Sequence, residues 1–127
     1  MLNLLIIGDG PCDLPFVKED YKYIDLRDDD RSNNLMDVFE KENPERIKEL
    51  REEIQRLDPE RIVVLGELEG YRWLGTIVCR CFGQFNSWLG QYENDYGKTV
   101  LKINDREVPL LAMNSVDEWR MYYEKRA

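Results

Sequence analysis

The residues of this chain whose types suit chemistry are carboxylate and amide side chains that follow short apolar stretches. Asp9 lies in the turn Gly8-Asp9-Gly10-Pro11, Asp25 closes a second apolar stretch, and Asn114 and Ser115 follow another. A carboxylate can act as a general base, and a side-chain amide can pair with a base edge through two hydrogen bonds. The 127-residue chain contains no histidine, which excludes histidine-based acid–base and nucleophilic chemistry.

The turn after the first apolar stretch also suggests a dinucleotide-binding loop, in which Asp25 would hold a ribose. Pro11 stands in place of the third glycine of such a loop, and Pro15 interrupts the segment that should form the following helix. Without a helix N-terminus there is no cradle for a pyrophosphate. The pattern therefore favours a tight turn over a phosphate-binding loop.

Metal and thiol sites are disfavoured by the spacing of their ligands. The run 28–30 of three aspartates could hold Mg²⁺, but adjacent aspartates are more typical of a solvated turn. Cys12, Cys79 and Cys81 form no Cys-x-x-Cys motif, and the last two suit the filling of a core. We expect the protein to bind no metal and no cofactor. We also expect it in a reducing compartment, which is the cytoplasm, or the host cytoplasm if the protein is viral.

The elements that must position these residues follow from periodicity and from stop signals. Short runs of branched aliphatic residues ended by glycine predict buried strands, and apolar residues every three or four positions predict helices. Pro44 after Asn43 marks a helix start, and Ser115 with Glu118 forms a capping box. The predicted order is strand 4–8, strand 21–26, helix 33–41, helix 44–57, strand 61–66, helix 74–90, strand 98–103, strand 108–113 and a helix after 115.

This order predicts one α/β domain over residues 1–127. Strands that alternate with helices indicate a three-layer, Rossmann-like domain with a central, mainly parallel sheet of four to five strands and helices on both faces. Strand 98–103 is expected at a sheet edge as part of a hairpin, and Pro109 at a strand start. The loop between the first two strands barely supplies a parallel crossover.

Parallel strands bring their carboxyl ends to one rim, where open α/β sheets bind ligands. The candidate site therefore combines the segments that follow each strand, with Phe16 as a ring that could stack on a base and Asn114 as a reader of its edge. The predicted ligand-binding residues are Gly8, Asp9, Gly10, Pro11, Phe16, Asp25, Gly66, Asn114 and Ser115.

Three segments together resemble motifs of the uracil-DNA glycosylase superfamily. They are the turn at 8–11 followed by Leu14-Pro15-Phe16-Val17, the segment 59–75, and the strand 108–115. The family's catalytic aspartate position is Gly10 here, and its His-Pro-Ser loop corresponds to Met113, Asn114 and Ser115. The resemblance implies that fold and a non-catalytic relative, because these substitutions remove the chemistry of the enzyme.

The net charge of −8 disfavours non-specific binding to nucleic acid and is compatible with a basic protein partner. No stretch is long enough to cross a membrane. We therefore expect a small acidic binding or accessory domain that takes a protein partner, a nucleobase or a nucleotide at the rim. The alternative is an enzyme that acts on a nucleotide or an N-glycosidic bond, with Asp9 as the carboxylate that activates water.

Overall fold

A five-stranded sheet forms the centre of the computed structural model, which describes residues 1–26, 44–66, 71–82, 100–113 and 115–126. The strand order is β2-β1-β3-β5-β4. Pairs β1–β2, β1–β3 and β3–β5 are parallel, and β4–β5 is antiparallel. The elements are β1 (Leu4–Gly8), β2 (Tyr21–Asp25), α2 (Pro44–Leu57), β3 (Ile62–Leu65), α3 (Tyr71–Cys81), β4 (Val100–Ile103), β5 (Arg106–Met113) and α4 (Val116–Arg126). The predicted α/β fold with a mainly parallel sheet is confirmed.

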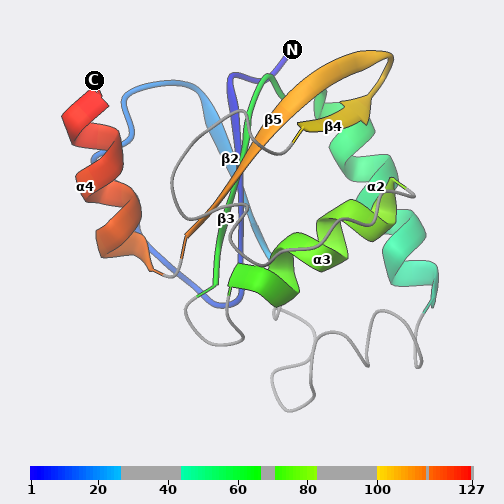
Figure 1. Cartoon of the computed structure of the whole chain (residues 1–127), viewed down its shortest axis with the longest axis horizontal. Coiled ribbons are helices and arrows are strands. Elements are labelled where there is room, and N and C mark those ends of the chain that lie inside the picture. Colours follow the sequence, from blue (N-terminus) through cyan, green and yellow to red (C-terminus); the bar gives the residue numbers. More distant parts are fainter. Residues whose placement is uncertain (27–43, 67–70, 83–99, 114, 127) are drawn as a thin grey trace.

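Alternating side chains of the central strands build two cores, one on each face of the sheet. Leu5 and Ile7 of β1 join the core that α2 and α3 cover, while Leu4 and Ile6 join the core under α4. All four are fully buried. Successive side chains of a strand point to opposite faces of the sheet, and here both faces are covered. For this reason every residue of β1 is buried and its sequence is a continuous apolar run. Figure 1 shows the sheet edge-on between α4 on one side and α2 and α3 on the other.

The helices match their sequence signals where they can be compared. α2 begins at Pro44 and ends at Leu57, as predicted, and Leu50 and Ile54 of its apolar stripe are buried. α3 begins at Tyr71, three residues before the predicted start at Leu74. The predicted continuation of this helix to residue 90 and the predicted helix 33–41 lie outside the described residues.

The connection from β1 to β2, residues 9–20, contains neither a helix nor a strand, and we call it the crossover segment. It lies on the same face of the sheet as α4, where Leu14 is buried and Phe16 and Val17 pack against the core. An extended connection spans a parallel crossover in fewer residues than a helical one, so this short loop suffices. One layer of the domain is thus a helix plus an irregular segment.

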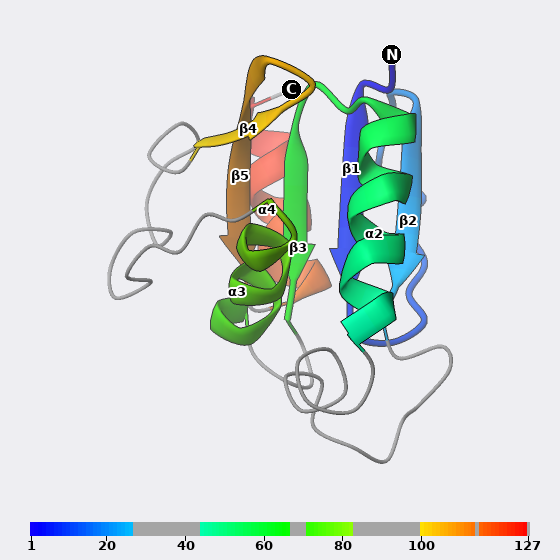
Figure 2. The ribbon, with the colours of Figure 1, turned by 90° about the vertical axis from the view of Figure 1, so that its right-hand side faces the viewer.

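The β4–β5 hairpin lies at the sheet edge, as predicted (Figure 2). Its turn residues Asn104 and Asp105 have φ values of 51° and 63°, the left-handed pair that a two-residue hairpin loop requires. The prediction that Pro109 starts a strand is wrong, because β5 already begins at Arg106. Pro109 is tolerated because it lies in the pair with Val100 that ends the β4 ladder, one residue before pairing with β3 begins.

Candidate functional site

The sheet has a point at its centre where the direction of chain progression reverses. From β1 the chain moves outward to β2 on one side, and it later returns to form β3 on the other side. The reversal point therefore lies between the carboxyl ends of the neighbouring strands β1 and β3. Open α/β sheets bind their ligands at this kind of position.

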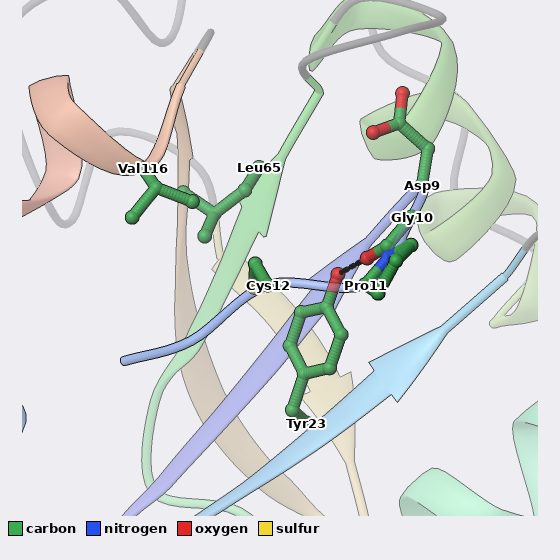
Figure 3. Close-up of a pocket in the computed structure, with 7 residues that line it drawn as sticks. All are labelled: Asp9, Gly10, Pro11, Cys12, Tyr23, Leu65 and Val116. Atoms are coloured by element: carbon green, nitrogen blue, oxygen red, sulfur yellow. Dashed lines mark hydrogen bonds between the residues drawn. The ribbon is translucent and has the colours of Figure 1, made fainter. Parts of the chain in front are cut away.

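A cavity of about 180 Å³ lies at this reversal point. Its walls come from the residues after β1, from the end of β3, from the middle of β2 and from the start of α4. Its lining residues are Asp9, Gly10, Pro11, Cys12, Tyr23, Leu65 and Val116 (Figure 3). Three separate elements and the crossover segment thus converge on one small space.

Tyr23 fixes the backbone on one side of the cavity. Its hydroxyl donates a hydrogen bond to the carbonyl oxygen of Gly10. Burial raises the pKa of Tyr23 far above its usual value, and a hydrogen bond with Cys12 and the charges of Cys12, Asp25 and Asp9 act in the same direction. The phenol therefore stays neutral at physiological pH and remains a hydrogen-bond donor.

Gly8 makes room for this tyrosine. A β-carbon at Gly8 would lie 2.9 Å from two ring carbons of Tyr23 and closer still to its hydroxyl. The two residues are close because β1 and β2 are adjacent and parallel, with Gly8 aligned with Asp25 and Ile6 aligned with Tyr23. The glycine that ends β1 is thus required by the ring of the neighbouring strand.

Asp9 brings a charged group to the cavity. It is 2% exposed, and it is the polar residue that the described parts of the chain bury most completely. In Figure 3 its carboxylate lies on the opposite side of the Gly10 backbone from the Tyr23 ring. An ionised carboxylate accepts hydrogen bonds and does not donate them.

Some predicted site residues come together here. Asp9, Gly10 and Pro11 line the cavity, and Gly8 directly precedes them. Gly66 follows the lining residue Leu65, and its amide donates to the carbonyl of Met113 at 2.9 Å, which joins the ends of β3 and β5.

Other predicted site residues have different roles or positions. The ring of Phe16 packs edge-to-face against Tyr123, with centroids 5.8 Å apart, and does not line the cavity. Asp25 ends β2 and acts on the site through its charge on Tyr23. The hydroxyl of Ser115 accepts a hydrogen bond from the amide of Glu118 at 3.1 Å and so caps α4. Asn114 lies outside the described residues.

The sequence interpretation missed Tyr23, Cys12, Leu65 and Val116 as lining residues. Leu65 and Val116 are apolar residues at element ends, which pattern alone assigns to the core. A tyrosine on the strand paired with a strand that ends in glycine was the available signal for Tyr23, because glycine often marks the close approach of another group.

Other candidate chemistry finds less support in the described residues. β1 is followed by the crossover segment and not by a helix, so the helix that directly follows the turn in a dinucleotide-binding loop is absent here. Within the ranges that the structure describes, no group of acidic and cysteine side chains is arranged to hold a metal ion. Cys79 and Cys81 are buried in the core as predicted, and burial raises the pKa of Cys81 to about 12. The aspartates at 28–30 are outside the described residues.

Comparison of the chain with profiles of protein families, with curated proteins and with solved structures finds no match. The resemblance to uracil-DNA glycosylases therefore stays a prediction. None of the helices in the described ranges has the length and apolar character needed to cross a membrane. The fold and the cavity are the observations on which a function must be argued.

Proposed function

We propose that this protein is a non-catalytic binding domain that takes a single-ring ligand of nucleobase size in the cavity between β1 and β3. The position of the cavity at the reversal point of the sheet is the observation that carries the proposal. A likeness in fold to uracil-DNA glycosylases is part of the same proposal, on the strength of the sequence resemblance.

The size of the cavity argues for one ring. Pockets for drug-sized ligands have volumes of roughly 300–1,000 Å³, whereas an apolar cavity of about 150 Å³ accommodates benzene. At about 180 Å³ this cavity has the capacity for a pyrimidine-sized ring and too little for the sugar and phosphate as well. Beside a protein partner, the sequence suggested a nucleobase or a nucleotide, and of these two small molecules the size favours the nucleobase.

The chemistry of the walls also argues for an uncharged ring. Leu65, Val116 and Pro11 offer apolar contact, and the phenol oxygen of Tyr23 can accept a ring N–H group. Among the residues that the structure describes, no lysine or arginine lines the cavity, so a phosphate would meet the charge of Asp9 without a cationic side chain to compensate it.

A binding test follows from these walls. Uracil, cytosine and thymine should raise the melting temperature and give a saturable calorimetric signal, whereas the corresponding monophosphates should bind more weakly. Val116→Phe fills the cavity and should abolish the binding. Met121→Phe places the same ring on the exposed side of α4, where Met121 is 70% exposed, and should leave it intact. Absence of binding by every base, or equal binding by both variants, contradicts the proposal.

Asp9 is buried at the cavity, so the alternative that this protein is an enzyme can be tested at this residue. Hydrolysis of an N-glycosidic bond would need Asp9 to activate water, and its product is a free base that can be measured from uracil- or hypoxanthine-containing oligonucleotides. We expect no base release by the native protein. Release that disappears in Asp9→Asn would establish an enzyme and contradict the non-catalytic proposal.

A further inference from the structure

Tyr123, in the last part of α4, holds the far end of the crossover segment. Its ring packs against Phe16 at a centroid distance of 5.8 Å and an interplanar angle of 66°. Its hydroxyl accepts a hydrogen bond from the amide of Lys18 at 3.1 Å and donates one to Oε2 of Glu19 at 3.1 Å. One side chain therefore contacts three residues of the segment through apolar and polar groups.

Glu19 connects this contact to the sheet. Its second carboxylate oxygen, Oε1, forms an ion pair with Arg61, the residue before β3. Both side chains are only partly exposed, at 23% for Glu19 and 33% for Arg61, so solvent screens the pair less than a fully exposed one. The far end of the segment is thus tied to α4 and to the start of β3 by side chains.

The near end of the same segment is a wall of the cavity. Gly10, Pro11 and Cys12 line the cavity, and the first residue of α4, Val116, lies across from them. The residues between form neither helix nor strand, and their turn is closed by a hydrogen bond from the amide of Val17 to the carbonyl of Leu14 at 3.2 Å. A segment that is held in place mainly by side-chain contacts has a lower free energy of local opening than paired strands have.

We infer that the crossover segment is a movable wall of the cavity and that Tyr123 is the latch that holds it against α4. Opening separates residues 12–20 from α4 while the sheet stays intact, and it exposes the partly open cavity further from the α4 side. The inference goes beyond the proposed function, because it concerns access to the cavity whichever molecule occupies it. Its test uses no ligand, so its failure and that of the proposed function are distinguishable.

Hydrogen exchange of the full chain, read by mass spectrometry, tests the latch. Tyr123→Phe keeps the ring and removes both hydroxyl hydrogen bonds, and Glu19→Gln removes the ion pair. Each should speed exchange in residues 12–20 by at least roughly fivefold, the effect of losing one hydrogen bond from a local opening equilibrium, and Tyr123→Phe, which loses two, should have the larger effect. Exchange in β1 and β3 should not change. Lys18→Ala, which keeps the amide that contacts Tyr123, is the matched control and should behave as the native protein.

Labelling of Cys12 with a bulky thiol reagent tests whether this opening exposes the cavity. Tyr123→Phe should speed its labelling by a similar factor, while Cys79 and Cys81, at 0% and 1% exposure, serve as internal references for global unfolding. Unchanged exchange overturns the latch. Faster exchange with unchanged Cys12 labelling overturns the movable wall. Acceleration of exchange throughout the sheet overturns a local opening.

Discussion

Gly8 and Tyr23 show how one residue determines what its neighbour in space can be. The phenol ring occupies the space that a side chain at Gly8 would need, and from there its hydroxyl reaches the carbonyl of Gly10. The tight turn after β1 is thereby held by a side chain of β2. The shape of the cavity depends on this pair although only Tyr23 lines it.

Gly8→Ala should destabilise the fold by about 1–3 kcal/mol, the usual cost of forcing an extra carbon into a packed site. Tyr23→Phe removes the nearest clashing atom, at the cost of the hydrogen bond to Gly10. The double variant should therefore lose less stability than the sum of the single variants, by at least about 0.5 kcal/mol. Urea denaturation of the four proteins measures this coupling, and strict additivity would show that the hydroxyl of Tyr23 does not restrict position 8.

At this scale the sequence predicted the backbone of the site better than its side chains. Asp9, Gly10 and Pro11 were identified because a Gly/Pro turn after a buried strand has a fixed place in an α/β sheet. Tyr23 was not identified as a site residue, because its role depends on the register of β2 against β1, which no local pattern encodes. Phe16 was assigned to a base, whereas α4 supplies its actual partner, Tyr123.

Among the elements, the β4–β5 hairpin is joined to the α2–β3 junction by a polar cluster. Asp58, which has a φ of 51°, accepts hydrogen bonds from Arg106 and, at 3.1 Å, from Asn104. Arg106 also donates to the carbonyl of Pro59 at 3.2 Å. The hydrogen bonds from Arg106 and Asn104 hold the pKa of Asp58 below its ordinary value of 3.8.

A lowered pKa makes this junction sensitive to acid. The stabilising contribution of Asp58 is fully present above the ordinary aspartate pKa and is lost as the pH falls below about 4. The stability difference between the native protein and Asp58→Asn should thus be largest above pH 5 and shrink below pH 4. Asparagine tolerates the left-handed backbone at this position.

Urea denaturation from pH 7 to pH 3 measures this difference. Asp105→Asn makes the same substitution at an exposed residue with a φ of 63° and controls for the loss of one negative charge. A difference between the native protein and Asp58→Asn that stays constant with pH would contradict the assignment.

The elements themselves were largely predictable, because each has a local signal. α2 has an N-terminal proline and an apolar stripe, and the edge hairpin has turn residues that tolerate a positive φ. The crossover segment had no such signal. Its place against α4 depends on contacts between residues about a hundred positions apart, such as Lys18 with Tyr123.

Across the whole molecule, the net charge of −8 should keep nucleic acid away. Ordinary non-specific DNA binding has dissociation constants of roughly 10⁻⁴–10⁻⁶ M at physiological salt. In 150 mM salt we expect fluorescence anisotropy to detect no binding of this protein to a random duplex DNA in that concentration range. A basic protein such as a histone or protamine should bind instead, with an affinity that falls as salt rises. Tight DNA binding at this salt would show that local basic surface outweighs the net charge.

The sheet order also has a consequence for how the chain reaches its native state. β3 is the bridge between β1 and β5, so the central sheet is complete only after residues 106–113 have been synthesised. Until then β3 (Ile62–Leu65) lacks its neighbour β5. The hairpin can form within microseconds, whereas the parallel pairings must close long loops. Nascent chains should therefore expose an unpaired, aggregation-prone strand edge until late in translation. We expect the yield and solubility of the expressed protein to depend on chaperones and temperature for this reason.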